Sequence, residues 1–423
     1  MKKSLFALAA LGAFAGAASA QSNVTLYGTL DMAVTYINNA GMAAGATAPT
    51  SPTATPSTGN ALAMTDYGIF SNVWGLKGEE DLGSGLKGIF NLEGDIIALN
   101  GTVYNNSTNG LNQIFRRAAN VGLSGSFGTV RLGQQGNPLV AASANLLPVE
   151  GNSVNLVRTV AGYSVGDFLA NAISYETPKM GGLVAKVAYS MNNQVDDTTG
   201  GSAWAANAFY DNGPFTVTLG YNQQSSISSP TSNVPTATPT SYINANVISC
   251  AAGTVCDLNS QANVNNPKFQ GNLKGYVAGV KYKVTPSLTV GYGFGHADYD
   301  SGTSAALVNG GPASAYNSSS EMLGVGYQAT PSLLLGLNYI VTNLDSNLWN
   351  AQARYSLSKR TMLYTQVGIA KNGAGSYQIN GKAFGNFTPV QVDTSGAPAA
   401  VTNYGGLPNT TQTSVSFGVV HNF

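Results

Sequence analysis

The sequence is poor in charged residues: Asp, Glu, Lys and Arg make up 9% of its 423 residues, against about 25% in ordinary soluble domains. Long apolar runs are also lacking. Beyond the first twenty residues, no stretch reaches the roughly 18 to 20 apolar residues that a membrane-spanning helix needs. A helical membrane protein is therefore excluded. A closed β-barrel is the spanning structure that remains, because lipid offers no partners to unpaired backbone groups, and a weakly charged surface suits contact with lipid.

Cysteine is scarce as well. The two cysteines, Cys250 and Cys256, lie six positions apart in a polar segment. No histidine is near them, and two thiolates alone do not complete a tetrahedral metal site, so we expect no metal. A small disulfide is the simpler interpretation for an exported chain, and the sequence leaves open whether the bond forms.

Two short motifs suggest chemistry but have simpler explanations. His296 lies near Asp298 and Asp300 in GFGHADYD, where a hydrolytic barrel would carry a catalytic group, but an interfacial strand end is the simpler reading. Residues 83–88 match the dinucleotide-binding glycine pattern, which requires a following helix. A strand-like segment follows instead, which indicates a hairpin turn. We expect no enzymatic activity, no cofactor and no nucleic-acid partner.

The N-terminus has the features of an export signal. Lys2 and Lys3 precede an apolar stretch from Leu5 to Ala18 and a small-residue site that ends at Ala20. This pattern is typical of a cleaved secretory signal peptide. We therefore divide the chain into a signal peptide, residues 1–20, and one transmembrane barrel domain, residues 21–423.

The mature chain does contain segments in which apolar and polar residues alternate with a period of two. In its opening segment, Val24, Leu26 and Val34 alternate with Thr25, Asp31 and other polar residues. Such alternation is typical of a barrel strand with one face toward lipid and one toward water. The same alternation occurs in residues 183–189, 215–221, 288–294, 333–339 and 363–369.

The connections fall into two sets of unequal length, as in transmembrane barrels with short periplasmic turns and long extracellular loops. Seven short segments have the turn residues Gly, Pro, Ser or Asp: 80–85, 124–128, 177–182, 211–214, 285–287, 330–332 and 358–360. Together they predict an all-β antiparallel barrel of about sixteen strands. Long surface loops are expected at 38–66, 223–268 and 371–412, and the Leu- and Val-richer segment 135–169 is expected to fold back inside the barrel.

Six blocks in order resemble the Gram-negative general-diffusion porins, a family of trimeric sixteen-stranded barrels. The blocks are NVTLYGTLD, WGLKGEEDLGSGLKGIFNLE, FRRAANVGLSGSFGTVRLGQQ, NAISYETPKMGG, YSLSKRTMLYTQ and SFGVVHNF. The resemblance covers nearly the whole chain. It implies a water-filled channel in the cell outer membrane for passive diffusion of small hydrophilic solutes and ions. It also implies a homotrimer in contact with outer-membrane lipid and lipopolysaccharide.

The resemblance implies further that the inward loop narrows the pore, with the acids Glu150 and Asp167 opposite basic wall residues and with Arg158 on the same loop. Alternation itself points four charged residues toward the pore: Lys77, Glu93, Arg131 and Lys186. Arg116 and Arg117 are adjacent, so one should point inward and the other should lie near an interface, and the family pattern selects Arg117 for the lumen.

Three positions depart from the family pattern. Val73, Phe168 and Leu169 stand where the family often has Arg, so any preference for anions or cations should be modest.

At the other end of the chain, the resemblance implies that the terminal Phe423 is recognised by the outer-membrane assembly machinery.

Three other functions stay open. One is a substrate-selective channel of the same fold. Another is a surface adhesin whose long loops do the work while the barrel anchors them, and the third is a barrel hydrolase.

Overall fold

The computed structural model describes residues 23–41, 58–103, 114–149, 151, 167–191, 202–225, 271–301, 316–343, 345–371, 386–387 and 411–423. The predicted signal peptide, Cys250 and Cys256 lie outside these ranges, so their assignments stay predictions. Among the described residues, no helix has the length and apolar character needed to cross a membrane.

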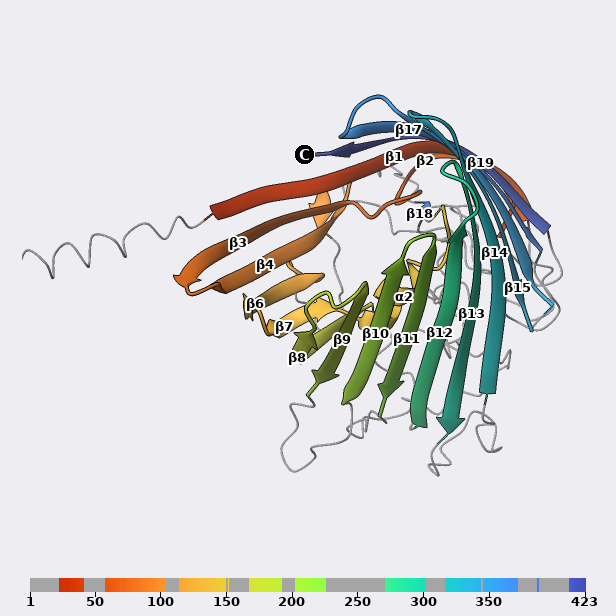
Figure 1. Cartoon of the computed structure of the whole chain (residues 1–423). Helices are drawn as coiled ribbons and strands as arrows, with labels where there is room; N and C mark the ends of the chain where they lie inside the picture. Colours follow the sequence, from red (N-terminus) through yellow and green to blue (C-terminus); the bar gives the residue numbers. More distant parts are fainter. Residues whose placement is uncertain are drawn as a thin grey trace, which may run out of the picture.

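The described residues form a closed antiparallel barrel of sixteen wall strands, as predicted (Figure 1). Strands β2 and β3 both pair with β1 and together make one wall strand, interrupted at residues 67–72. The barrel closes where β1 pairs with β19. The wall consists of β1 (Asn23–Gly41), β2 (Thr58–Asp66), β3 (Val73–Gly83), β4 (Leu86–Ile97), β6 (Ala118–Gly125), β7 (Gly128–Gly136), β8 (Phe168–Glu176), β9 (Leu183–Ser190), β10 (Ala203–Asn212), β11 (Phe215–Gln224), β12 (Gly271–Lys283), β13 (Leu288–Ser301), β14 (Tyr316–Thr330), β15 (Leu333–Thr342), β16 (Asn347–Ser356), β17 (Thr361–Lys371) and β19 (Thr411–Asn422).

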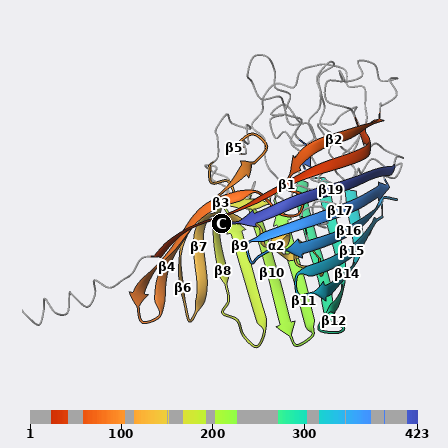
Figure 2. The ribbon, with the colours of Figure 1, turned by 90° about the horizontal axis from the view of Figure 1, so that it is seen from above.

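Three short elements lie outside this wall. The two-residue strands β5 (Thr102–Val103) and β18 (Asn386–Phe387) pair with β4 and β2. The helix α2 (Pro138–Ser143) lies inside the ring of strands, as the view from above shows (Figure 2).

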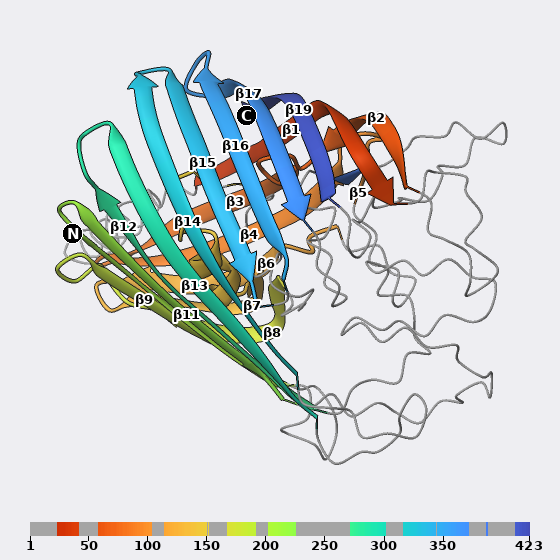
Figure 3. The same cartoon turned by 90° about the vertical axis from the view of Figure 1, so that its right-hand side faces the viewer.

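The predicted alternation decides which face of each strand meets lipid. On β1, Val24, Leu26 and Val34 are 58%, 59% and 48% exposed, whereas Asp31 and Thr35 are fully buried. Because successive side chains of a strand point to opposite faces, the exposed set lies on the outside of the barrel and the polar set inside. The neighbouring registers carry this alternation around the whole wall, whose outer side is visible in Figure 3.

All seven predicted short turns join hairpins at one end of the barrel. The turn between β3 and β4 illustrates the local cause, since Gly83, Ser84 and Gly85 have φ angles of 88°, 53° and 78°. Left-handed backbone of this kind suits glycine, which has no Cβ to clash. The glycines thus serve a tight turn and not a nucleotide site.

One loop prediction is wrong in its bounds. Of the surface loop predicted over residues 38–66, residues 38–41 belong to β1 and Thr58–Asp66 form β2, which pairs with β1, whereas residues 42–57 lie outside the described residues. Leu62 and Met64 of β2 are 73% and 55% exposed and continue the outer apolar face. The Ala- and Thr-rich composition of this segment hides its short alternation.

The closing strands also hold the end of the chain. The N–H of Phe423 donates to the carbonyl oxygen of Gly28 at 3.1 Å, and the N–H of Gly28 donates to the carbonyl oxygen of Phe423 at 3.2 Å. The Phe423 ring lies against Gly28, where a Cβ would collide with it. Phe423 therefore belongs to the closing seam of the barrel.

We predict that deleting Phe423 reduces assembly in cells more than it reduces the stability of the folded barrel. The ring is 42% exposed, so its loss should cost at most a few kcal/mol of burial energy. The measurements are the amount of heat-resistant protein in outer membranes and the refolding yield in detergent, with Phe417→Ala on the same strand as the control. Normal assembly of the deletion variant would contradict a signalling role for Phe423.

Candidate functional site

The segment that follows β7 turns into the barrel and lines part of its inner wall. Asn137 caps α2, since its side-chain oxygen accepts from the N–H of Leu139 and Pro138 takes the first helical position. Leu139, Ala142 and Leu146 are at most 1% exposed. The described residues 137–149 and 151, which we call the inner segment, therefore pack their buried apolar side chains against the wall.

Inward-facing glycines form the surface on which the inner segment packs. At Gly220 of β11, a Cβ would lie 2.6 Å from the Cβ of Ala142, and at Gly291 of β13 it would lie 2.8 Å from Pro148. At Gly336 of β15, it would lie 2.6 Å from Cγ1 of Val149. Because these distances are too short for any side chain, glycine at these wall positions is what allows the segment to approach the wall so closely.

Hydrogen bonds from the same side of the wall fix the position of the inner segment. Asn207 Nδ2 on β10 donates to the carbonyl oxygen of Pro138 at 2.9 Å, and Asn338 Nδ2 on β15 donates to that of Val149 at 3.1 Å. Between them, Lys281 Nζ on β12 donates to Asn145 Oδ1 at 2.5 Å. The segment is thus attached along an arc of the wall from β10 to β15.

A second segment turns inward, and the sequence does not predict it. Residues 67–72, between β2 and β3, are held by Asp31 of β1. Its Oδ2 accepts from the N–H groups of Ile69 at 2.6 Å and Phe70 at 2.7 Å, and its Oδ1 accepts from the Tyr364 hydroxyl at 2.6 Å. Three donors compensate for burial of the carboxylate, because a buried charge needs hydrogen-bond partners. An acidic residue on the inner face of the first strand is the one available signal.

The two inward segments meet at β16. A Cβ added to Gly151 would lie 3.5 Å from the carbonyl oxygen of Ile69 and 3.5 Å from Nη2 of Arg354, so Gly151 is close to both residues. The Arg354 guanidinium in turn lies 5.5 Å from the centre of the Phe70 ring. Inward-facing side chains on this side of the barrel are at most 3% exposed: Thr218, Asn338, Asn350, Gln366 and Ser416. On the other side, along β3, β4, β7 and β9, Lys77 is exposed and Glu93, Arg131 and Lys186 are half-buried. We call this more open side the exposed wall.

This exposed wall carries a cluster of paired charges. Arg117 Nε donates to Glu93 Oε1 at 2.6 Å, and its Nη1 donates to Asp95 Oδ1 at 3.1 Å. Arg116 Nη2 donates to Asp95 Oδ2 at 2.7 Å. Both guanidinium groups lie over the Phe168 ring, at 5.3 Å for Arg116 and 5.2 Å for Arg117. Each carboxylate is thus neutralised by an arginine.

The prediction that Arg116 and Arg117 point to opposite sides is wrong. Both residues precede β6, which begins at Ala118, so strand alternation does not apply to them. Their long side chains converge on Asp95, which neither alternation nor the resemblance singles out. Phe168, which stands where the family often has an arginine, instead provides the aromatic face on which both arginines stack.

Three predicted wall cations remain without an ion pair in the described part of the chain: Lys77, Arg131 and Lys186. The strand registers put them on the inner face, opposite Asn91, Gly122 and Asn207 respectively. Lys77 Nζ lies 5.0 Å from the centre of the Tyr27 ring, and Arg131 Nη1 donates to Asn120 Oδ1 at 3.1 Å.

The inward loop carries the remaining predicted residues. Glu150 and Arg158 lie outside the described residues, so their opposition to the wall cations stays a prediction. Asp167 lies directly before β8, where its carbonyl oxygen accepts from the N–H of Asn137 at 2.9 Å. It therefore closes the base of the inward loop.

The histidine motif lies on the outer face. His296 Nε2 is 2.9 Å from Asp298 Oδ1, and the ring packs near Tyr276 and Phe294 on β12 and β13. Among the described residues, no group of three or more His, Cys, Asp or Glu side chains could hold a metal ion.

A closed barrel whose lumen is lined by charged and polar side chains is typical of a pore-forming protein. Comparison with known proteins supports this class. A family model described as Gram-negative porin matches residues 7–375. The chain therefore belongs to the Gram-negative porin family, and it is a channel-forming β-barrel of the outer membrane.

Two relatives and one solved structure illustrate the similarity. Outer membrane porin protein 32 of Delftia acidovorans is 37% identical over 237 residues, which cover 53% of this chain and 60% of that protein. An outer membrane porin protein of Bordetella pertussis is 29% identical over 395 residues, covering 88% of this chain and 95% of that protein. The anion-selective porin from Comamonas acidovorans has the same fold, with a TM-score of 0.65, 23% identity and coverage of 95% of this chain and 100% of that one.

We predict that Gly336→Val displaces the inner segment and raises single-channel conductance. The new side chain would collide with Val149, and overpacking of this kind costs about 1 to 3 kcal/mol. Conductance in planar bilayers is the measurement. Gly136→Ala is the matched control, since a Cβ at Gly136 would meet nothing within 4 Å. Equal conductance of Gly336→Val and the unmodified channel would show that the contact between Val149 and the wall does not set the pore width.

Proposed function

We propose that this porin lets small hydrophilic solutes and ions diffuse passively through its lumen and that the field in the lumen favours anions. The observation that carries the proposal is the imbalance of unpaired charge on the exposed wall. Glu93 and Asp95 are compensated by Arg116 and Arg117 at 2.6 to 3.1 Å. The three wall cations without an ion pair then decide the sign of the field.

Glu176 of β8 is the acidic neighbour of these cations. It is the register partner of Lys186 on β9, and it lies two residues after Ser174, the register partner of Arg131. It forms no ion pair with either cation among the described contacts, and one carboxylate does not offset Lys77, Arg131 and Lys186 together. A narrow lumen with low-dielectric walls concentrates the field of the excess positive charge, so anions should enter more readily than cations.

A catalytic function gains little support from the one His and Asp pair among the described residues. His296 and Asp298 lie on the outward face, and their ring neighbours Tyr276 and Phe294 suit an aromatic girdle at a membrane interface. We infer that the protein performs no covalent chemistry and needs no cofactor.

We also propose a homotrimer, because the aromatic girdles do not surround the barrel completely. On β10 to β16, two rows of outward rings are spaced as the two interfaces of a membrane require: Trp204, Tyr221, Tyr276, Tyr339 and Trp349 in one row, and Tyr210, Phe215, Tyr282, Tyr327 and Tyr355 in the other. On β1, β6 and β7 the exposed outward residues are mostly aliphatic, such as Leu26, Val121 and Leu132.

The girdled face suits outer-membrane lipid and lipopolysaccharide, whereas the aliphatic face suits contact with neighbouring copies of the chain. The assembly machinery of the outer membrane would recognise Phe423 before the copies associate.

We predict that Leu26→Ala lowers the temperature at which the unheated oligomer dissociates on gels, while Leu219→Ala does not. Both leucines are outward and about half exposed, at 59% and 51%. A cavity in a protein interface loses packing, whereas lipid chains can fill the space beside Leu219 because they are as apolar as the leucine they replace. Equal dissociation temperatures for the two variants would argue against an interface at β1.

We predict that Arg131→Gln and Lys186→Gln each shift selectivity toward cations. A unit charge about 8 Å from an ion in water changes the energy of an anion and that of a cation by about 0.5 kcal/mol each, in opposite directions, which corresponds to a roughly fivefold change in the ratio of anion to cation permeability. Reversal potentials across a KCl gradient measure this ratio. Glu79→Gln, outside the charged cluster and paired with Lys87 at 2.8 Å, is the control, because it removes a carboxylate and should shift the ratio the other way or not at all. A cation preference of the unmodified channel would refute the proposal.

A further inference from the structure

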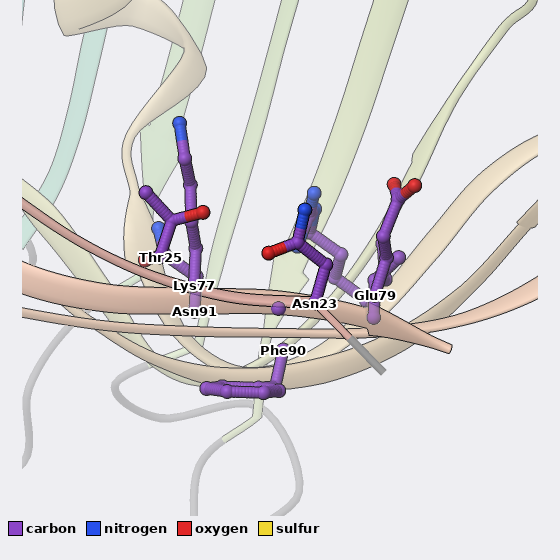
Figure 4. Close-up of a pocket in the computed structure, with 9 residues that line it drawn as sticks. Asn23, Thr25, Lys77, Glu79, Phe90 and Asn91 are labelled. Carbon is purple, nitrogen blue, oxygen red and sulfur yellow. The ribbon is translucent and has the colours of Figure 1, made fainter. Parts of the chain in front are cut away.

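A concave site on the exposed wall is not explained by passive conduction alone. It has a volume of about 270 Å³ and opens between β1, β3 and β4 (Figure 4). Arg131 of β7 is among its lining residues. Its polar lining consists of Asn23, Thr25, Lys77, Glu79, Asn91 and Arg131. In Figure 4, Lys77 and Glu79 extend to one side of the sheet, whereas the Phe90 ring points away from it.

The charge of this pocket is positive. Lys77 and Arg131 make no ion pair among the described residues, whereas the carboxylate of Glu79 is held by Lys87 at 2.8 Å. Arg131 uses Nη1 for Asn120, which leaves the other N–H groups of its planar fork available. Such a fork matches two oxygens of one carboxylate or phosphate group.

The uncharged lining residues add donors. Asn91 Oδ1 accepts from the Tyr27 hydroxyl at 2.9 Å, so the amide NH₂ of Asn91 is the group left to donate. The same hydroxyl lies 2.7 Å from Glu93 Oε2, which fixes the Tyr27 ring beneath the Lys77 ammonium group. The site therefore offers two cations and an amide donor held in place by a hydrogen-bonded ring.

We propose that this pocket is a weak binding site for a small oxyanion that carries two negative charges, with phosphate as its simplest representative. The pocket lies next to the Glu93 and Arg117 pair and on its turn side, because Lys77 pairs with Asn91 while Glu93 lies two residues further along β4. An anion that passes the paired charges from the loop side thus reaches the pocket next. The proposal rests on the anion preference proposed above and adds a specific binding site on the route of the anion through the lumen.

Weak binding is what transport requires. A site in a channel must bind its solute well enough to favour entry and release it fast enough to permit flow. We therefore expect phosphate to slow chloride current at millimolar concentration without closing the channel.

The experiment measures chloride current through the full-length channel in planar bilayers while potassium phosphate is added, and it extracts the half-blocking phosphate concentration. Arg131→Gln should raise this concentration about tenfold, since it removes a charge-assisted bidentate contact. Asn91→Ala should raise it a fewfold while leaving the KCl reversal potential unchanged, because it removes a donor and no charge.

Lys186→Gln is the matched control, since it removes a cation of the same wall that does not line the pocket. Its half-blocking concentration should stay within about twofold of the unmodified channel, the size expected of a distant unit charge. Absence of block by phosphate would overturn the proposal. So would equal shifts for Arg131→Gln and Lys186→Gln with no effect of Asn91→Ala, because the general field would then explain them. Failure of the proposed function is a separate result, namely a reversal potential in KCl alone that favours cations.

Discussion

Backbone hydrogen bonding at the closing seam is the constraint on which the rest of this structure depends. In lipid, an unpaired N–H or C=O group costs several kcal/mol, so β1 must pair with β19 for the wall to exist at all. The register runs without interruption from Thr29 with Asn422 to Asn38 with Thr413. Only a wall closed in this way separates an outer surface from a lumen, and only then does alternation along each strand place apolar and polar side chains on different sides.

Within the closed wall, the lumen is built asymmetrically. One side consists of inward glycines and amide side chains that bind the inner segment, and of Asp31, which holds residues 67–72. The other side keeps its long charged side chains, of which Lys77 is exposed and Arg131 and Lys186 are half-buried. Small residues on one side and large charged residues on the other thus decide where the solute path runs. The balance of paired and unpaired charge along that path then sets its selectivity.

Much of this architecture could be predicted from the sequence because its causes are local. Alternation on β1 and the glycines between β3 and β4 need only their own neighbours along the chain. The features that could not be predicted depend on contacts between distant residues. Asp31 gives no local sign that it binds Ile69 and Tyr364, and Arg116 meets Asp95 only after β4 and β6 pair. The roles of Glu150 and Arg158 stay predictions, since the position of a loop is decided by the partners it finds.

The long reach of the inner segment has a consequence for the order of events during folding. Val149 is bonded to Asn338, 189 residues later in the chain, and Pro138 is bonded to Asn207, 69 residues later. Contacts between residues so far apart require long loops to close and form after more local pairings. The wall position that holds Val149 does not exist until β14 and β15 have paired. The inner segment can therefore take its final position only after β14 and β15 are in place, so the width of the lumen is fixed by contacts that come later than the pairing of neighbouring strands.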